Sequence, residues 1–123
     1  MGYNYKNMHN FENLRVYQRG LDITDDIYTL TSKFPKDEVF GLTNQLRRAI
    51  VSIVLNIAEG SGKTKKDFRH FLNMSRTSAY ESTAILEIAK RRKYISDEEF
   101  KTFYHQLEII IKMINKLRSS IHD

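Results

Sequence analysis

Hydrophobic residues recur at helical spacing in four stretches of the chain, and polar, glycine or proline residues separate these stretches. Within each stretch, apolar side chains return every three or four positions, which is the period of one face of an α-helix. Pro35 interrupts the first pattern, because the residue before a proline is pushed out of helical geometry. The pattern predicts four helices, over residues 11–31, 38–59, 65–93 and 97–120.

The breaks between these stretches are short, so successive helices have to lie antiparallel beside one another. We therefore predict an all-α fold, an up-down-up-down antiparallel four-helix bundle that forms a single domain over residues 11–123. Residues 1–10 lack a hydrophobic pattern, and we expect a flexible N-terminus there.

Residues at the predicted helix ends support these boundaries. Thr64 with Asp67, and Ser96 with Glu99, have the spacing of N-terminal caps, in which a side-chain oxygen accepts from a free backbone N–H. Gly60 is suited to a left-handed cap at the end of the second helix. In the third helix the apolar seam contains small residues, which we expect to let a neighbouring backbone approach closely.

The second helix is apolar in almost every direction over residues 49–58. A helix of this kind is buried on all sides, and one bundle neighbour covers only part of it, so we predict a closed homo-oligomer. The polar exceptions lie three or four positions apart and share one face, and they contain no evident nucleophile–base pair. We interpret them as a structural network that fixes helix register or subunit packing: Gln45, Arg48, Ser52, Asn56 and Glu59.

The net charge is +5, and one segment accounts for all of it. Residues 63–95 carry nine basic and three acidic side chains, whereas the rest of the chain is close to neutral. A charge concentrated in this way favours an anionic partner such as nucleic acid. The candidate RNA-binding residues form two groups: Lys63, Lys65, Lys66 and Arg69, and then Lys90, Arg91, Arg92, Lys93 and Tyr94.

The two groups differ in what else could explain them. Cations at the start of a helix oppose its dipole, so the first group is not placed for helix stability, although a solvated lysine-rich turn remains the alternative. Cations at the end of a helix are favourable for the dipole alone, which offers a structural explanation for the second group. Tyr94 beside them suits single-stranded RNA, because an aromatic ring can stack on a base.

Several kinds of chemistry are disfavoured. The segment from Gly60 to Thr64 lacks the spacing of a nucleotide-binding loop, since Ile57 stands where the first glycine should be, and a helix precedes it. The four histidines have no metal-ligand spacing, and the chain has no cysteine. We expect no catalytic residues, no metal and no cofactor, and hence a protein that is not an enzyme.

No apolar run approaches the length of a membrane span, and residues 1–6 lack the apolar core of a signal peptide. We therefore expect a cytoplasmic protein with no membrane partner.

Short motifs follow one another along the chain: Phe11 to Leu14, Phe34 to Glu38, Leu42 to Ala49, Ser52 with Ile53, and Asn56 to Gly60. In this order they resemble the motifs of a known family, the four-helix bundle proteins encoded by intervening sequences within bacterial 23S rRNA genes, and the match is specific in the middle third of the chain. In the third helix the family usually has Gly-Ser before a Glu, where this chain has residues 77–81 as Thr-Ser-Ala-Tyr-Glu.

The resemblance implies a bacterial protein that assembles as a pentameric ring of bundles. It also implies a relationship to accessory proteins of reverse transcriptases in diversity-generating retroelements. Together with the charge pattern, it leads to the hypothesis of a non-enzymatic, self-associating protein that presents a basic surface to RNA or to an RNA-bound protein. The alternative is a structural or protein-interaction module that does not bind nucleic acid.

Overall fold

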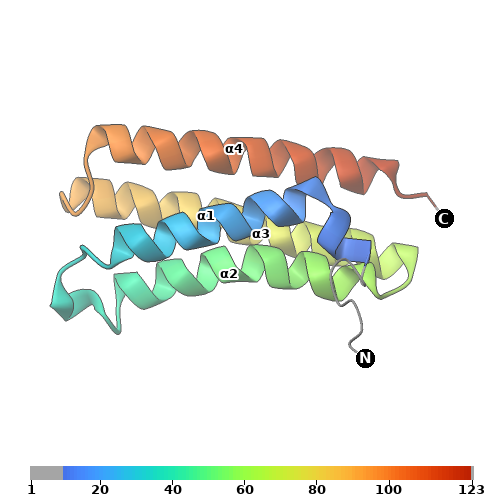
Figure 1. Cartoon of the computed structure of the whole chain (residues 1–123), viewed down its shortest axis with the longest axis horizontal. Helices are drawn as coiled ribbons and strands as arrows, with labels where there is room; N and C mark the ends of the chain where they lie inside the picture. The colour runs from blue at the N-terminus through green and yellow to red at the C-terminus, as the bar shows by residue number, and fades with distance from the viewer. Residues whose placement is uncertain (1–9, 123) are drawn as a thin grey trace, which may run out of the picture.

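The computed structural model describes residues 10–122, and in this range it is an antiparallel four-helix bundle without strands (Figure 1). The predicted all-α fold is confirmed. The expected flexible segment over residues 1–10 falls outside the described range, apart from Asn10, which begins a 3-10 helix. The elements in chain order are η1 (Asn10–Asn13), α1 (Arg15–Thr31), η2 (Lys36–Glu38), α2 (Leu42–Ser61), α3 (Lys65–Arg91) and α4 (Asp97–Ser120).

The core lies along the bundle axis and is filled by aliphatic side chains from all four helices. The α2–α3 contact is the most extensive, and the α1–α4 contact is the least. The predicted seam of α3 is buried, and its small residues do allow close approach: the buried Ser75 Oγ donates to the backbone oxygen of Ile53 on α2 at 2.8 Å. The side chains that are almost fully buried include Ile23, Ile27, Leu46, Ile50, Ile53, Ile57, Leu72, Leu86, Leu107, Ile110 and Ile114.

The second helix begins later than the sequence suggested. Residues 36–38 form the separate 3-10 helix η2, and α2 starts only at Leu42. The Glu38 carboxylate accepts from the backbone N–H of Leu42 at 3.1 Å, so it satisfies one of the free donors at the start of α2. Phe40, in the connection between η2 and α2, is 93% exposed.

The prediction of a left-handed cap at Gly60 was wrong. Gly60 is buried inside the last turn of α2, the helix ends at Ser61, and no described glycine has a positive φ. A Cβ atom at Gly60 would lie 2.5 Å from the Cβ of Phe71 on α3. The glycine is therefore explained by the close approach of α3, which the sequence near Gly60 does not reveal.

The predicted caps of the last two helices are confirmed. The Thr64 hydroxyl accepts from the backbone N–H of Asp67 at 3.2 Å. Ser96 and Glu99 form a complete capping box, with bonds of 2.9 and 3.0 Å. These two caps start α3 and α4 at the opposite ends of the bundle (Figure 1).

A single chain covers α2 better than we expected. Apolar residues 49–58 are buried or half-buried with one exception, Leu55, which is 61% exposed. The apolar surface left over on this part of α2 is therefore a narrow line formed by Leu55 with the half-buried Val51 and Ala58. Among the helices of residues 10–122, none is both long and apolar enough to cross a membrane.

Candidate nucleic-acid interface

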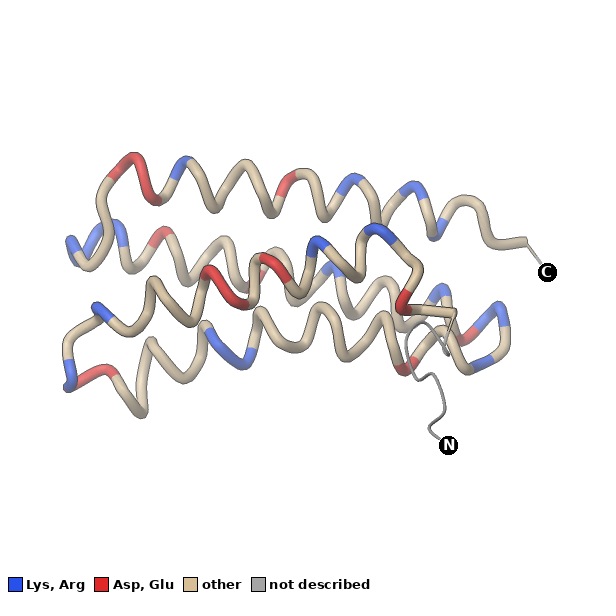
Figure 2. Tube along the Cα trace, viewed as in Figure 1, with Lys and Arg blue, Asp and Glu red and all other residues tan. Residues whose placement is uncertain are grey.

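The two basic groups of the sequence lie at opposite ends of the bundle, because α3 runs its whole length (Figure 2). The first group stands at the start of α3, beside the start of α1 and the end of α4. The second stands at the end of α3, beside the turn into α4. We refer to these regions as the α3 N-terminal end and the α3 C-terminal end.

At the α3 N-terminal end, three lysines are exposed: Lys63, Lys65 and Lys66. Lys63 Nζ lies 6.0 Å from the centroid of the Phe71 ring, and Arg69 Nη1 donates to the backbone oxygen of Ile121 at 3.3 Å. Arg69 thus joins α3 to the end of α4. The three exposed lysines lie next to this contact between the two helices.

A groove that the sequence did not predict lies at the same end. It runs between the start of α1 and the last turns of α4, the pair of adjacent helices with the least extensive contact, and it has a volume of about 600 Å³. Three cations line it: Arg15, Arg19 and Lys116. They lie in segments whose net charge is near zero, so only the packing of α1 against α4 brings them together. The apolar lining consists of Leu14, Val16, Ile109, Met113 and Leu117.

At the α3 C-terminal end, the helix stops at Arg91, two residues before the predicted end. The N–H of Tyr94 donates to the Ala89 oxygen and the N–H of Lys93 to the Lys90 oxygen, each at 2.9 Å. This pair of bonds is a Schellman motif, which requires a left-handed residue before Tyr94. Lys93 occupies that position with a φ of 64°, where glycine is usual.

Tyr94, a candidate for base stacking, is engaged within the bundle. Its ring is half-buried and packs against Phe34 with centroids 5.5 Å apart, and its hydroxyl donates to Glu38 Oε2 at 2.7 Å. Hydrogen bonds from the Leu42 N–H and the Tyr94 hydroxyl lower the pKa of Glu38. Burial opposes them with a smaller effect, and the charge of Arg92 adds the smallest contribution, which also lowers this pKa. Tyr94, whose ring centroid lies 5.9 Å from the guanidinium carbon of Arg92, in turn raises the pKa of Arg92.

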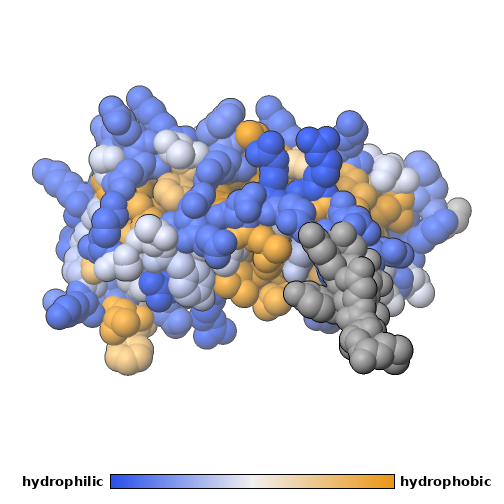
Figure 3. Space-filling view, viewed as in Figure 1, coloured by the Kyte–Doolittle hydropathy of each residue, from blue (hydrophilic) through white to orange (hydrophobic). Residues whose placement is uncertain are grey.

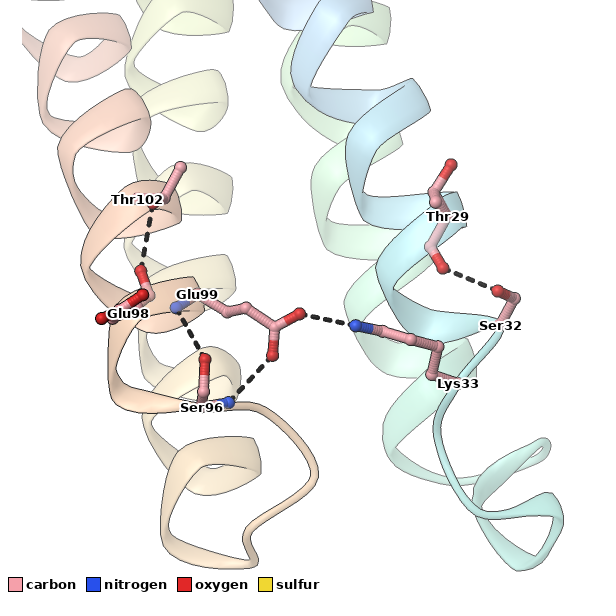
Figure 4. A network of polar contacts seen from close by, with 7 residues as sticks. All are labelled: Thr29, Ser32, Lys33, Ser96, Glu98, Glu99 and Thr102. Carbon is pink, nitrogen blue, oxygen red and sulfur yellow. Dashed lines mark hydrogen bonds and ion pairs between the residues drawn. The ribbon is translucent and has the colours of Figure 1, made fainter.

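Acidic side chains surround this end. Lys33, just after α1, forms an ion pair of 2.5 Å with Glu99 at the start of α4 (Figure 4). The hydrogen bond from Lys33, followed by that from the Ser96 N–H, lowers the pKa of Glu99. A hollow of about 640 Å³ beside the turn is lined by side chains of both signs: Lys90, Arg91, Lys93, Asp97 and Glu99.

Only two of the five polar residues predicted to form a network on α2, Ser52 and Asn56, take part in side-chain hydrogen bonds. Asn56 Nδ2 donates to the backbone oxygen of Ser52 at 2.8 Å and to Ser52 Oγ at 2.9 Å, and Ser78 Oγ of α3 donates to Ser52 Oγ at 2.9 Å. Ser52 and Asn56 thus link α2 to α3. The other three residues are exposed, and their side chains have no hydrogen-bond partner within residues 10–122: Gln45, Arg48 and Glu59.

The described residues contain no group of three or more histidine, aspartate or glutamate side chains that could hold a metal ion. The segment from Gly60 to Thr64 comprises the last two residues of α2 and the connection to α3, and its Thr64 caps α3.

Comparisons with known proteins agree with this fold. Five chains of solved structures match. One is the crystal structure of a protein with unknown function from the S23 ribosomal protein family of Bacteroides thetaiotaomicron. It has a TM-score of 0.79 and 24% sequence identity, over 85% of this chain and 96% of that chain, so the likeness concerns the fold. No curated protein matches the chain. The model of the 23S rRNA-intervening sequence protein family matches residues 12–116, and the chain therefore belongs to that family.

Proposed function

We propose that the protein is a non-enzymatic, self-associating bundle that binds RNA through the α3 N-terminal end. The observation that carries the proposal is the convergence of cations from three helices at this end. The exposed Lys63, Lys65 and Lys66 lie at the same end of the bundle as the groove cations of α1 and α4 (Figure 2). A cluster of this kind attracts a phosphate backbone and gains free energy by releasing its counterions.

The family supports RNA as the anion. Its name refers to 23S rRNA, and the similar Bacteroides protein is described as a member of a ribosomal protein family. An RNA-bound protein, such as the reverse transcriptase that the sequence resemblance implies, would bring an RNA to the same surface.

The direct test is the affinity for a labelled single-stranded RNA, measured by fluorescence anisotropy at several salt concentrations. We expect log Kd to rise steeply with log salt, because each phosphate contact releases condensed counterions. Lys63→Glu with Lys65→Glu should weaken binding of unrelated RNAs equally and flatten this slope.

The matched control is Lys36→Glu with Lys101→Glu, which removes the same charge at exposed positions near the opposite end. It should change the affinity much less. If the wild type has no RNA affinity at low salt, or if both double variants weaken binding equally, the proposal is wrong.

Exposed hydrophobic side chains support the self-association. Phe40, Val39 and Leu55 are 93%, 52% and 61% exposed, and Figure 3 shows hydrophobic side chains that protrude near the η2–α2 turn. Such exposure of large apolar groups is typical of an interaction surface. Light scattering should give a mass several times 14.5 kDa, and the sequence resemblance implies five subunits.

Leu55→Ser should lower this mass, whereas Leu21→Ser, at an apolar residue on α1 that is 37% exposed, should leave it unchanged. A single species near 14.5 kDa for the wild type would contradict self-association.

The groove favours a second candidate function. Its apolar lining with three cations suits an acidic amphipathic protein segment, whose apolar face would fill the groove while its carboxylates meet the rim. In that case binding would depend on the apolar residues. Met113→Ser would then weaken the interaction more than Lys65→Ala, the reverse of the order expected for RNA.

A further inference from the structure

We propose that a hollow between α3 and α4 at the α3 C-terminal end binds one unpaired RNA base, with guanine preferred. The inference rests on the proposed RNA binding and adds to it a site that reads a base. The hollow has a volume of about 360 Å³ and is lined by Glu87, Lys90, Arg91, Phe100 and Tyr104. Positions 87, 90 and 91 share one face of α3, and positions 100 and 104 share one face of α4.

The aromatic side chains differ in how much of their rings is free. Lys90 Nζ lies 4.9 Å from the centroid of the Phe100 ring, so one face of Phe100 already has a cation over it. The rings of Phe100 and Tyr104 lie 5.7 Å apart at 44°, and Tyr104 is 43% exposed. Tyr104 is therefore the ring on which an incoming base can stack, and Phe100 supports it from the side.

Glu87 gives the hollow its selectivity. Its carboxylate is exposed and has no hydrogen-bond or ion-pair partner within residues 10–122. A carboxylate offers two acceptor oxygens, and the pairing edge of an unpaired guanine offers two adjacent donors, N1–H and the N2 amino group. Adenine and cytosine each place an acceptor nitrogen beside their amino group, and uracil has two carbonyl oxygens on this edge, so guanine fits best.

The cations of the hollow complete the site. Lys90 and Arg91 stand within one turn of Glu87, where they can meet the phosphates on either side of the stacked base. The first and last residues of α3 are about 40 Å apart at 1.5 Å per residue. A strand that crosses α3 would thus contact phosphates at the N-terminal end and present one base at the C-terminal end.

Ten-nucleotide repeats of UUG and of UUA test the site, because they carry the same backbone charge and neither is self-complementary by Watson–Crick pairing. We expect the wild type to bind the UUG repeat at least about fivefold more tightly than the UUA repeat. Tyr104→Leu should weaken both by at least about fivefold, since one stacked base is lost. Tyr104→Phe should restore both affinities. The matched control is Tyr80→Leu, at an α3 tyrosine that is 53% exposed and outside the hollow, and it should have no effect.

Glu87→Gln tests the reading of guanine. It should bring the UUG and UUA affinities together, whereas Glu81→Gln, at another exposed carboxylate of α3, should preserve the preference while removing the same charge. The base site is wrong if RNA binding depends on salt but shows no preference for guanine, or if the Tyr104→Leu and Tyr80→Leu variants bind RNA with equal affinity. Either result leaves the proposed function standing. No RNA binding at low salt overturns both.

Discussion

The two ends of α3 carry similar groups of cations, and they differ in what surrounds them. At the N-terminal end, Lys63, Lys65 and Lys66 are exposed, and further cations of α1 and α4 lie nearby. At the C-terminal end, the guanidinium of Arg92 lies over the Tyr94 ring and acidic residues of α4 are close by. A group of cations in a sequence therefore does not measure the charge that is available to a partner, because neighbouring helices add to it or neutralise it.

This difference separates two kinds of contact. A surface with an excess of cations suits phosphates, whose contacts hold an RNA without reading its sequence. Mixed charges beside exposed aromatic rings suit bases, which offer donors, acceptors and a flat face. The comparison can be tested at each end with variants that change one contribution at a time.

The largest effect is expected from the groove cations. Arg19→Ala with Lys116→Ala should lower the slope of log Kd against log salt by roughly 1.4, the amount for two lost contacts to single-stranded RNA. Arg91→Ala with Lys93→Ala should lower it by less than half as much, because carboxylates already balance part of that charge. Equal changes in the two double variants would remove the distinction between the ends.

A glycine at one end is the next test. Gly60→Ala should destabilise the fold by about 1–3 kcal/mol, because its Cβ would collide with Phe71 and force α2 and α3 apart. Gly62→Ala is the matched control, since the nearest atom to its Cβ would be the Glu59 oxygen at 3.8 Å and its φ is −90°. Urea unfolding followed by circular dichroism measures both. A Gly60→Ala variant as stable as the wild type would disprove the close contact.

At the other end a lysine stands where glycine is usual. Lys93→Gly should stabilise the fold by about 1 kcal/mol. The left-handed conformation costs a non-glycine residue roughly 1–2 kcal/mol, and glycine avoids this cost. Part of the gain is lost because glycine makes the unfolded chain more flexible. Lys93→Ala separates the conformation from the charge and should leave the stability nearly unchanged. A loss of stability in Lys93→Gly would show that the left-handed turn is not strained.

The smallest effect concerns acid. The pKa values of Glu38 and Glu99 are both lowered in the folded protein. Their contribution to stability is therefore present above the unfolded pKa and is lost as the pH falls through the folded pKa. Unfolding by urea at pH 7 and at successively lower pH should show a loss of stability in acid that is smaller when both residues are replaced by glutamine. An unchanged pH profile in this double variant would contradict the assigned role.

The sequence predicted the elements that depend on neighbours along the chain. Three such features are present in the structure: the helical period of the apolar residues, the Thr64 and Ser96 caps, and the small residues in the α3 seam. Each of them depends on residues of a single helix and its cap. The contacts that no local pattern predicted join residues far apart. Lys33 meets Glu99 and Glu38 meets Tyr94, separated by 66 and 56 positions, and Gly60 is explained by Phe71 on the next helix. The groove likewise depends on the packing of α1 against α4, two helices from opposite ends of the chain.

The weak contact between α1 and α4 has a consequence for motion. The seam with the fewest contacts is where a bundle opens first, so amide hydrogens in the first turns of α1 should exchange with solvent faster than those in the centre of α3. The groove cations Arg19 and Lys116 belong to the two sides of this seam. An RNA strand that bridges them would hold α1 against α4. RNA binding should therefore slow the exchange of amide hydrogens in the first turns of α1.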